Sequence, residues 1–298
     1  MYIEYTAFAW THNLLASLFP NGIGERISNF GFLREELLAI IMSKSVLITG
    51  ACYGTGFAVA ERFAKEGYNV FVSGRNKAKA DAAAKALSEK YGVFAKGYHT
   101  TAFEQDEVTE VFADIKNNGY SVDSIVLNAA NLGIGQESLN VDIEDFMGVY
   151  KINVAWNFMM AREAAKQMKD NGGGSIVFIT SNSAVRVTEN RCAYCSSKSA
   201  ILAMSKSFAV DWGKYGIRSN CVLPGMIKTE RWENNVNNCK YYLANYTPIQ
   251  DIADFTDIAN AVWYFASDAS NNTTGAELVV DGGMLAQLTP NIERELWK

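Results

Sequence analysis

The sequence has little histidine, only His12 and His99, and its five cysteines are an odd number. Cys192 and Cys195 form a C-x-x-C pair, but a zinc site would need a second pair of ligands, and nothing else in the sequence has that spacing. We therefore expect no metal site. We also expect free thiols, because a chain of 298 residues can build a core without disulfides.

Long apolar runs and an excess of basic residues are also absent. One of the longest apolar runs, at 37–42, has six residues, against the roughly 18 needed to span a bilayer. The chain has 27 basic and 32 acidic residues, the wrong balance for binding nucleic acid or anionic lipid. The N-terminus lacks the basic region of a signal peptide. We expect a cytoplasmic protein with a small-molecule ligand and no nucleic-acid or membrane partner.

The sequence is rich in hydrophobic residues, at 49%, with only 20% charged residues. From residue 43 onward, short apolar runs alternate with helical patterns. Runs without polar alternation predict strands buried on both faces, and hence a parallel sheet covered by helices. No Pro-rich or Gly/Ser-rich linker interrupts 43–298, so we expect one domain. The expected strands are 46–50, 68–73, 124–127, 174–180, 218–223 and 276–281, and the expected helices are 57–66, 77–90, 145–169, 194–215 and 254–267.

Residues 1–42 precede the sheet pattern but carry many apolar side chains, among them Trp10, Phe19 and Phe30. A segment this apolar would be sticky if it were exposed. We therefore expect an N-terminal extension that packs on its own subunit or across an oligomer interface.

A glycine cluster, Thr49-Gly-Ala-Cys-Tyr-Gly-Thr-Gly, follows the first expected strand and opens a helix. Glycines let the backbone turn tightly and bring its N–H groups against a pyrophosphate at a helix N-terminus. A plain structural turn is the alternative, but the strand before and the helix after favour a dinucleotide site. The expected cofactor-binding residues here are Gly50, Cys52, Tyr53, Gly54, Thr55 and Gly56.

Tyr194 and Lys198 are four residues apart at the start of an expected helix, so they share a face. A nearby ammonium stabilises a phenolate. Tyrosine titrates near 10, and moving its pKa to roughly 7 takes about 4 kcal/mol, which Lys198 and a bound nicotinamide cation could supply together. Taken alone, the same spacing fits a solvated helix face.

Other polar residues stand where expected strands end. Ser181 follows one strand, Asn128-Ala-Ala follows another, and Pro224-Gly225 follows a third, while Asn153 interrupts an apolar helical stretch. Each could be a turn or a cap. Together they indicate a site at the carboxyl edge of the sheet, where open α/β folds bind ligands.

With these residues in hand, 44–286 resembles the classical short-chain dehydrogenase/reductase family. The matching pieces are the glycine pattern, Asn128-Ala-Ala, Asn153, Ser181 thirteen positions before Tyr194, Tyr-x-x-x-Lys, Pro224-Gly225 with Ile227 and Thr229, and Val280-Asp-Gly-Gly. The resemblance implies one Rossmann-like, doubly wound domain with a seven-stranded parallel sheet. It also implies a homotetramer and NAD(P)-dependent interconversion of alcohols and ketones.

The resemblance also implies roles for single residues. Tyr194 exchanges the oxygen-bound proton, and Ser181 hydrogen-bonds the developing oxyanion. Lys198 lowers the Tyr194 pKa and binds the nicotinamide ribose, and Asn153 holds a water that relays protons to Lys198. The remaining expected cofactor contacts are Asn128, Ala129, Ala130, Pro224, Gly225, Ile227 and Thr229.

One departure from the family pattern concerns the choice of cofactor. Gly74 stands where NAD-dependent relatives place an acid that binds the ribose diol. Arg75, followed by Asn76, could instead pair with a 2′-phosphate. Tyr53 argues the other way, since many NADP-dependent relatives carry a basic residue in that loop. We expect NADP(H), with Arg75 and Asn76 as cofactor residues.

An aromatic-rich segment after Gly225 indicates the class of substrate. We expect it to form a lid over the substrate, with the residues Trp232, Tyr241, Tyr242 and Tyr246. Large aromatic side chains suit a bulky apolar ligand. We expect a steroid ketone or alcohol, as in bacterial hydroxysteroid dehydrogenases. A 3-oxoacyl thioester is the alternative substrate.

Two other functions are weighed against this enzyme. Related cofactor-free dehalogenases replace the lysine by arginine and lose the glycine loop, and this chain keeps both. A non-catalytic dinucleotide-sensing protein would not need the pair of Tyr194 and Lys198.

Overall fold

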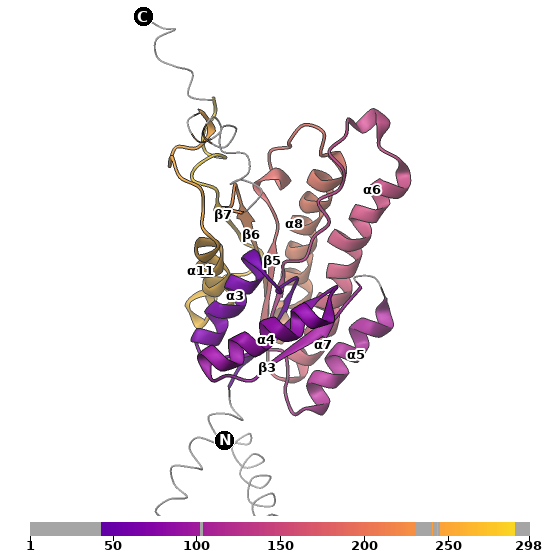
Figure 1. The fold of residues 1–298 in the computed structure, drawn as a ribbon, viewed down its shortest axis with the longest axis vertical. Coiled ribbons are helices and arrows are strands. Elements are labelled where there is room, and N and C mark those ends of the chain that lie inside the picture. The colour runs from indigo at the N-terminus through magenta and orange to yellow at the C-terminus, as the bar shows by residue number, and fades with distance from the viewer. Residues whose placement is uncertain (1–42, 102–103, 230–239, 241–242, 244, 290–298) are drawn as a thin grey trace, which may run out of the picture. The chain divides into compact units, whose positions relative to one another are not determined.

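The computed structural model describes residues 43–101, 104–229, 240, 243 and 245–289. Within them, seven parallel strands form one sheet in the order β3-β2-β1-β4-β5-β6-β7, with helices on both faces (Figure 1). This confirms the expected doubly wound Rossmann-like fold. The strands are β1 Ser45–Thr49, β2 Asn69–Gly74, β3 Ala95–His99, β4 Ser124–Leu127, β5 Gly174–Ile179, β6 Ile217–Pro224 and β7 Glu277–Val280.

Alternate residues of each central strand enter opposite halves of the core. In β1, Val46 and Ile48 pack in the half of the core on one face of the sheet, whereas Leu47 packs in the half on the other face. Both halves exclude water from the strands, which is why these strands have no polar alternation. The main helices are α3 Gly54–Lys65, α4 Lys77–Tyr91, α5 Gln105–Asn117, α6 Ile143–Tyr150, α7 Asn157–Asp170, α8 Cys192–Trp212 and α11 Phe255–Ala266.

Three features differ from the expected elements. β3 and α5 were not expected, because β3 reads Ala-Lys-Gly-Tyr-His and shows no apolar run. Gly97 in β3 lets α4 pack closely, since a Cβ there would lie 2.5 Å from the Ala80 carbonyl carbon. The single helix expected at 145–169 is α6 and α7 joined by a π-helical turn, Lys151–Trp156. Such turns are rare and occur often at functional sites.

The order of the strands places the site. Chain connections run outward in opposite directions from the neighbouring strands β1 and β4, and ligands of open α/β sheets bind at that switch point. Because all strands are parallel, the segments after β1, β4, β5 and β6 leave from the same edge. Tertiary structure therefore gathers the expected site residues, although they are spread over more than half of the chain.

Membrane and metal features were searched in the same residues. No helix of the described part is long and apolar enough to cross a bilayer. Among the described residues, no group of three His, Cys, Asp or Glu side chains could hold a metal ion. Cys52, Cys192, Cys195 and Cys221 are free thiols.

Phe63 lies in the half of the core under α3, and replacing it tests the packing there. Its side chain is fully buried and meets Tyr68 and Trp263 edge to face, with centroid distances of 5.2 and 5.3 Å. We expect Phe63→Ala to cost about 3–5 kcal/mol and to lower the melting temperature by about 10 °C. Leu139→Ala is the control, since that side chain is 86% exposed. Equal shifts in the two variants, measured by thermal denaturation, would contradict this packing.

Candidate active site

The loop between β1 and α3 requires glycine at three positions. Gly50 and Gly54 have φ angles of +63° and +59°, which side chains with a Cβ rarely adopt. A Cβ on Gly56 would lie 2.4 Å from the Gly50 carbonyl oxygen. The conformation of this backbone therefore depends on glycine, and its role in holding a dinucleotide stays a prediction.

Asn128, expected as a cofactor contact, braces this loop from the end of β4. Its Nδ2 donates to the carbonyl oxygens of Thr49 and Gly50, each at 3.0 Å. In return, the Thr49 hydroxyl accepts from the backbone N–H groups of Asn128 and Ala129 at 3.0 and 3.1 Å. Ala130 follows on the exposed side. The Asn-Ala-Ala motif thus holds the glycine loop in place.

The N-terminus of α3 fits the pyrophosphate of a dinucleotide. Its first turn contains no acidic residue, and Tyr53 at the N-cap position makes no side-chain cap. The first N–H groups of a helix lack intrahelical partners and carry partial positive charge, so they attract an anion. Gly54, Thr55 and Gly56 form this turn, with Cys52 and Tyr53 before it.

Gly74 ends β2 beside the same loop. A Cβ on Gly74 would lie 2.5 Å from the Cys52 sulfur, so the cysteine occupies the space of an acidic side chain. Arg75 is exposed, whereas Asn76 caps α4 by accepting from the Lys79 N–H at 3.0 Å. Burial raises the pKa of Cys52, and the positive charge of Lys79 opposes that rise. The position of the expected acid is therefore electropositive.

Ser181 and Tyr194 come together from different elements. Ser181 directly follows β5 and caps a short 3₁₀ turn by accepting from the Ser183 N–H at 3.1 Å. Tyr194 lies in the first turn of α8. Burial raises the pKa of Tyr194 above its usual value, while a hydrogen bond from Ser181 lowers it in part. The serine is thus positioned at the phenolic oxygen.

Lys198 lies one turn further along α8 and is only 2% exposed. Its Nζ donates to the Ile179 carbonyl of β5 at 2.9 Å and lies 5.7 Å from the centroid of the Tyr194 ring. Burial lowers the pKa of Lys198 to about 8. Burial is the largest influence on the Tyr194 pKa in the protein alone, and the expected lowering by Lys198 together with a bound nicotinamide stays a prediction.

Asn153 is fully buried in the π-helical turn. Its Oδ1 accepts from the Asn131 N–H at 2.7 Å, and its Nδ2 donates to the Asn131 carbonyl at 3.0 Å and to the Ser197 hydroxyl at 2.9 Å. Both amide protons are thus used within the protein, which leaves an Oδ1 lone pair for any relaying water. Asn131 and Ser197 were not among the expected residues, although both directly adjoin expected motifs.

The segment after β6 completes the edge. The Gly225 N–H donates to the Val280 carbonyl at 2.9 Å, and a Cβ on Gly225 would lie 2.6 Å from the Cβ of Asp281. Pro224 ends β6, and Ile227 forms a parallel bridge with Ala253. Thr229 is the last described residue before 230–239.

Only part of the expected lid lies within the described residues. Tyr246 lines a cavity together with the loop that follows β7. Trp232, Tyr241 and Tyr242 lie outside the described residues, so their role stays a prediction.

The contact between Ser181 and Tyr194 predicts a change in titration. We expect Ser181→Ala to raise the pKa of Tyr194 further, because the variant loses the hydrogen bond that opposes the effect of burial. The ultraviolet phenolate signal that Tyr194→Phe removes should then appear at higher pH than in the Ser181 enzyme. Ser183→Ala is the matched control, since its hydroxyl lies 3.3 Å from that of Thr188. No shift in the Ser181 variant would contradict the contact.

Comparison with known proteins supports this arrangement. A family model described as Enoyl-(Acyl carrier protein) reductase matches residues 50–285. The 3-oxoacyl-acyl-carrier-protein reductase of Rickettsia bellii is 34% identical over 247 residues, 82% of this chain and 98% of that protein. The 7alpha-hydroxysteroid dehydrogenase of Clostridium sardiniense is 32% identical over 243 residues, 80% of this chain and 92% of that protein.

A solved structure shares the fold described above. The L-sorbose reductase of Gluconobacter frateurii, complexed with NADPH and L-sorbose, superposes with a TM-score of 0.78 at 28% identity, over 83% of this chain and 98% of that one. An NAD⁺-bound xylitol dehydrogenase superposes with a TM-score of 0.76 at 26% identity, over 80% and 98%. With its parallel sheet and glycine loop, the chain belongs to the classical short-chain dehydrogenase/reductase family and is an NAD(P)-dependent oxidoreductase that interconverts alcohols and ketones.

Proposed function

We propose that the enzyme acts on a secondary alcohol or ketone of a bulky apolar substrate, such as a steroid. The observation that supports this most is a cavity of about 280 Å³ beside the Ser181 segment. Apolar side chains form much of its wall, namely Val187, Met284, Leu285 and Leu288. Hydroxysteroid dehydrogenases are also among the relatives, at 32% and 31% identity.

We propose the following roles for the residues of this chain. The backbone of Gly50 to Gly56 holds the pyrophosphate at α3, and Lys198 binds the ribose next to the nicotinamide. When bound, the cofactor supplies or accepts the hydride. Tyr194 donates the proton to the carbonyl oxygen during reduction, and Ser181 stabilises the negative charge that develops on that oxygen. The raised pKa of Tyr194 keeps the phenol protonated, as a proton donor requires.

A 3-oxoacyl thioester is the second candidate substrate. It is supported by the relative from Rickettsia bellii, which is 34% identical. Turnover of a steroid ketone, a 3-oxoacyl thioester and a four-carbon ketone, each with NADPH and NADH, separates the candidates. Equal kcat/KM for the steroid and the small ketone would contradict a bulky substrate, and faster turnover of the thioester would favour the second candidate.

Tyr194→Phe tests the role of the phenol directly. The substitution removes one hydroxyl, so we expect the fold and cofactor binding to be unchanged while kcat falls by about 10²–10⁴. Tyr264→Phe is the matched control, because Tyr264 is on the far end of α11 and is 40% exposed. If the Tyr194 variant kept more than about a tenth of the activity, in assays of ketone reduction, another group would have to donate the proton.

We propose NADP(H) as the preferred cofactor. Position 74 is a glycine and so provides no carboxylate for a free ribose diol, and the Cys52 sulfur lies 2.5 Å from where a Cβ would stand. Arg75 is exposed, and within the described part of the chain it makes no ion pair. Its guanidinium is therefore available to a 2′-phosphate, with the charge of Lys79 nearby.

Arg75→Ala tests this preference. A hydrogen bond to a charged group contributes about 1.5–3 kcal/mol, so the Kd for NADPH should rise about 10- to 150-fold while the Kd for NADH stays nearly constant. Lys85→Ala removes an exposed cation elsewhere on α4 and serves as the control. Equal losses for both cofactors, or a starting enzyme that prefers NADH, would overturn the assignment.

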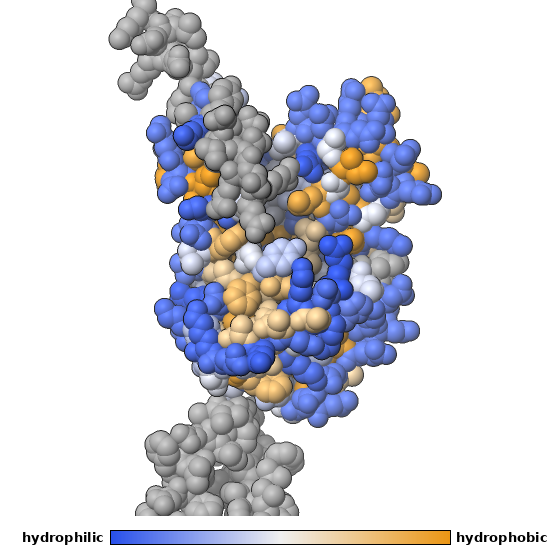
Figure 2. All heavy atoms as spheres, in the orientation of Figure 1, coloured by the Kyte–Doolittle hydropathy of each residue, from blue (hydrophilic) through white to orange (hydrophobic). Residues whose placement is uncertain are grey.

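We also propose a homotetramer. Apolar side chains are exposed on α6 and α8, with Ile143 at 71%, Met147 at 51% and Val210 at 80%. Figure 2 shows apolar atoms among hydrophilic ones at the α6 end of the molecule. Burying such residues against other copies is a common reason for oligomers.

The packing of residues 1–42 stays a prediction because they lie outside the described residues. A cytoplasmic location also stays a prediction.

A further inference from the structure

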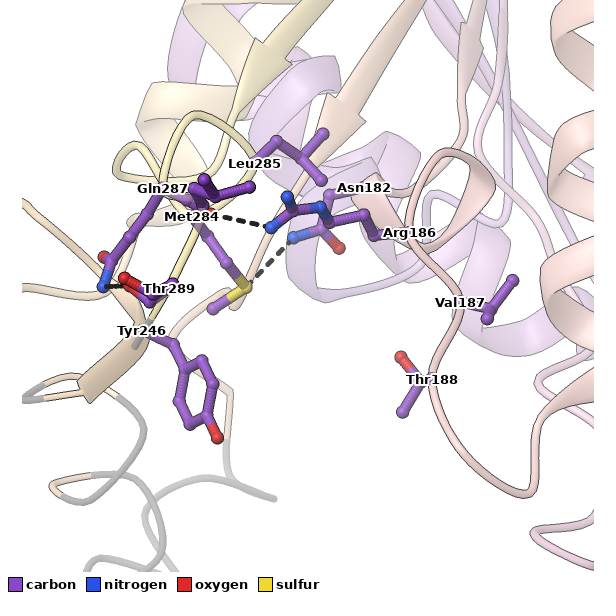
Figure 3. A pocket seen from close by; sticks show the side chains of 10 residues that line it. Asn182, Arg186, Val187, Thr188, Tyr246, Met284, Leu285, Gln287 and Thr289 are labelled. Atoms are coloured by element: carbon purple, nitrogen blue, oxygen red, sulfur yellow. Dashed lines mark hydrogen bonds between the residues drawn. The ribbon is translucent and has the colours of Figure 1, made fainter. Parts of the chain in front are cut away.

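The cavity next to Ser181 has walls from three segments of the site. Asn182 follows Ser181, and its Nδ2 lies 3.4 Å from where a Cβ on Gly225 would stand. Thr188, on the opposite wall, donates its N–H to the sulfur of Cys195, the residue after Tyr194, at 3.5 Å. The loop after β7 closes the cavity with Met284 and Leu285 (Figure 3). The cavity therefore adjoins the segments that carry Ser181 and Tyr194.

Arg186 is the one charged side chain among the described residues that line this cavity. Figure 3 shows it extending from the loop after β5 toward the loop after β7, where its Nη1 donates to the Gln287 carbonyl at 2.7 Å. A guanidinium has five N–H donors, so one such bond leaves most of them for other partners.

No carboxylate neutralises this cation within the described part of the chain. Arg186 makes no ion pair there. Asp281, the acid at the start of the loop after β7, accepts from the N–H groups of Gly283 and Leu285 at 2.9 and 2.8 Å. The cavity thus combines apolar and polar side chains with an exposed guanidinium that no described carboxylate pairs with.

We propose that Arg186 determines substrate specificity by binding an anionic group, a carboxylate or a phosphate, on an otherwise apolar substrate. This inference rests on the proposed function and narrows its substrate class. An apolar body would contact Val187, Met284 and Leu288, while the planar guanidinium forms paired hydrogen bonds to the anion. Either of two substrates would provide the anionic group: a bile-acid-type steroid through its side-chain carboxylate, or a phosphopantetheine thioester through its phosphate.

The competing explanation is that Arg186 only braces the loop after β7 through Gln287. Two substitutions separate the roles. Arg186→Gln retains a side-chain donor but removes the charge, whereas Arg186→Lys retains the charge. Lys214→Gln, a distant basic residue that contacts the Tyr215 ring, is the matched control for net charge.

The experiment compares substrates that differ only in charge, using the full chain with NADPH. One pair is a keto-steroid with a side-chain carboxylate and its methyl ester, and the other is a 3-oxoacyl thioester of phosphopantetheine and of pantetheine. For the substrate class that the enzyme uses, we expect kcat/KM to be higher for the anionic member of the pair. We expect Arg186→Gln to reduce that preference by about 10- to 100-fold, through an increase in KM. Arg186→Lys should restore much of it, and Lys214→Gln should not change it.

Equal losses for the charged and neutral members, or no loss for either, would overturn the proposal and leave the oxidoreductase function intact. Absence of turnover with every probe and with both cofactors would instead contradict the proposed substrates. In that case, calorimetry in the presence of NADP⁺ compares the affinities for the steroid carboxylate and its ester, and this comparison tests the anion site. A preference for the carboxylate that Arg186→Gln abolishes supports the anion site, and equal affinities refute it.

Discussion

The buried amide of Asn153 is the interaction on which the catalytic half of the site depends. It connects the π-helical turn to the Asn131 backbone after β4 and to Ser197 on α8. Leaving a buried polar group unpaired costs about 1–3 kcal/mol, so each partner must stay within hydrogen-bond distance. Ser197 immediately precedes Lys198, and therefore the same amide fixes the helical turn that carries this lysine. The π-helical turn can be understood as the local distortion that brings Asn153 to these partners.

The cofactor half of the site is held mainly through the backbone. The side-chain amide of Asn128 donates hydrogen bonds to the carbonyl oxygens of Thr49 and Gly50, and these bonds hold the glycine loop against the end of β4. The loop's own N–H groups at the start of α3 remain directed at a ligand. Rigid support behind the loop reduces the entropy that would otherwise be lost on binding. Cys52 then lies against Gly74 at the end of β2, beside the same loop.

Burial governs the charges of the catalytic pair. It raises the pKa of Tyr194 and lowers that of Lys198 to about 8, in each case because the charged form is poorly solvated. The protein alone therefore holds a neutral phenol, ready to donate a proton to a carbonyl oxygen. The hydrogen bond from Ser181 lowers the Tyr194 pKa in part, and the proposed mechanism uses the same serine to stabilise a developing oxyanion. Arg186 adds a positive charge to the wall of the cavity that adjoins the Ser181 segment.

The sequence by itself determined the fold class and the family, and it predicted the residues of the site, because these depend on local signals. Apolar runs predict buried strands, and glycine spacing together with Tyr-x-x-x-Lys predicts a nucleotide loop and a helical catalytic pair. Only the tertiary structure decided what depends on contacts between distant segments: the strand β3, whose glycine admits α4, and the π-helical turn around Asn153. It also decided the contact between Cys52 and Gly74, the raised pKa of Tyr194, and the place of Arg186 in the wall of a cavity. The physical reason is that packing distance, burial and the balance of charge come from residues far apart in the chain, which no short motif records.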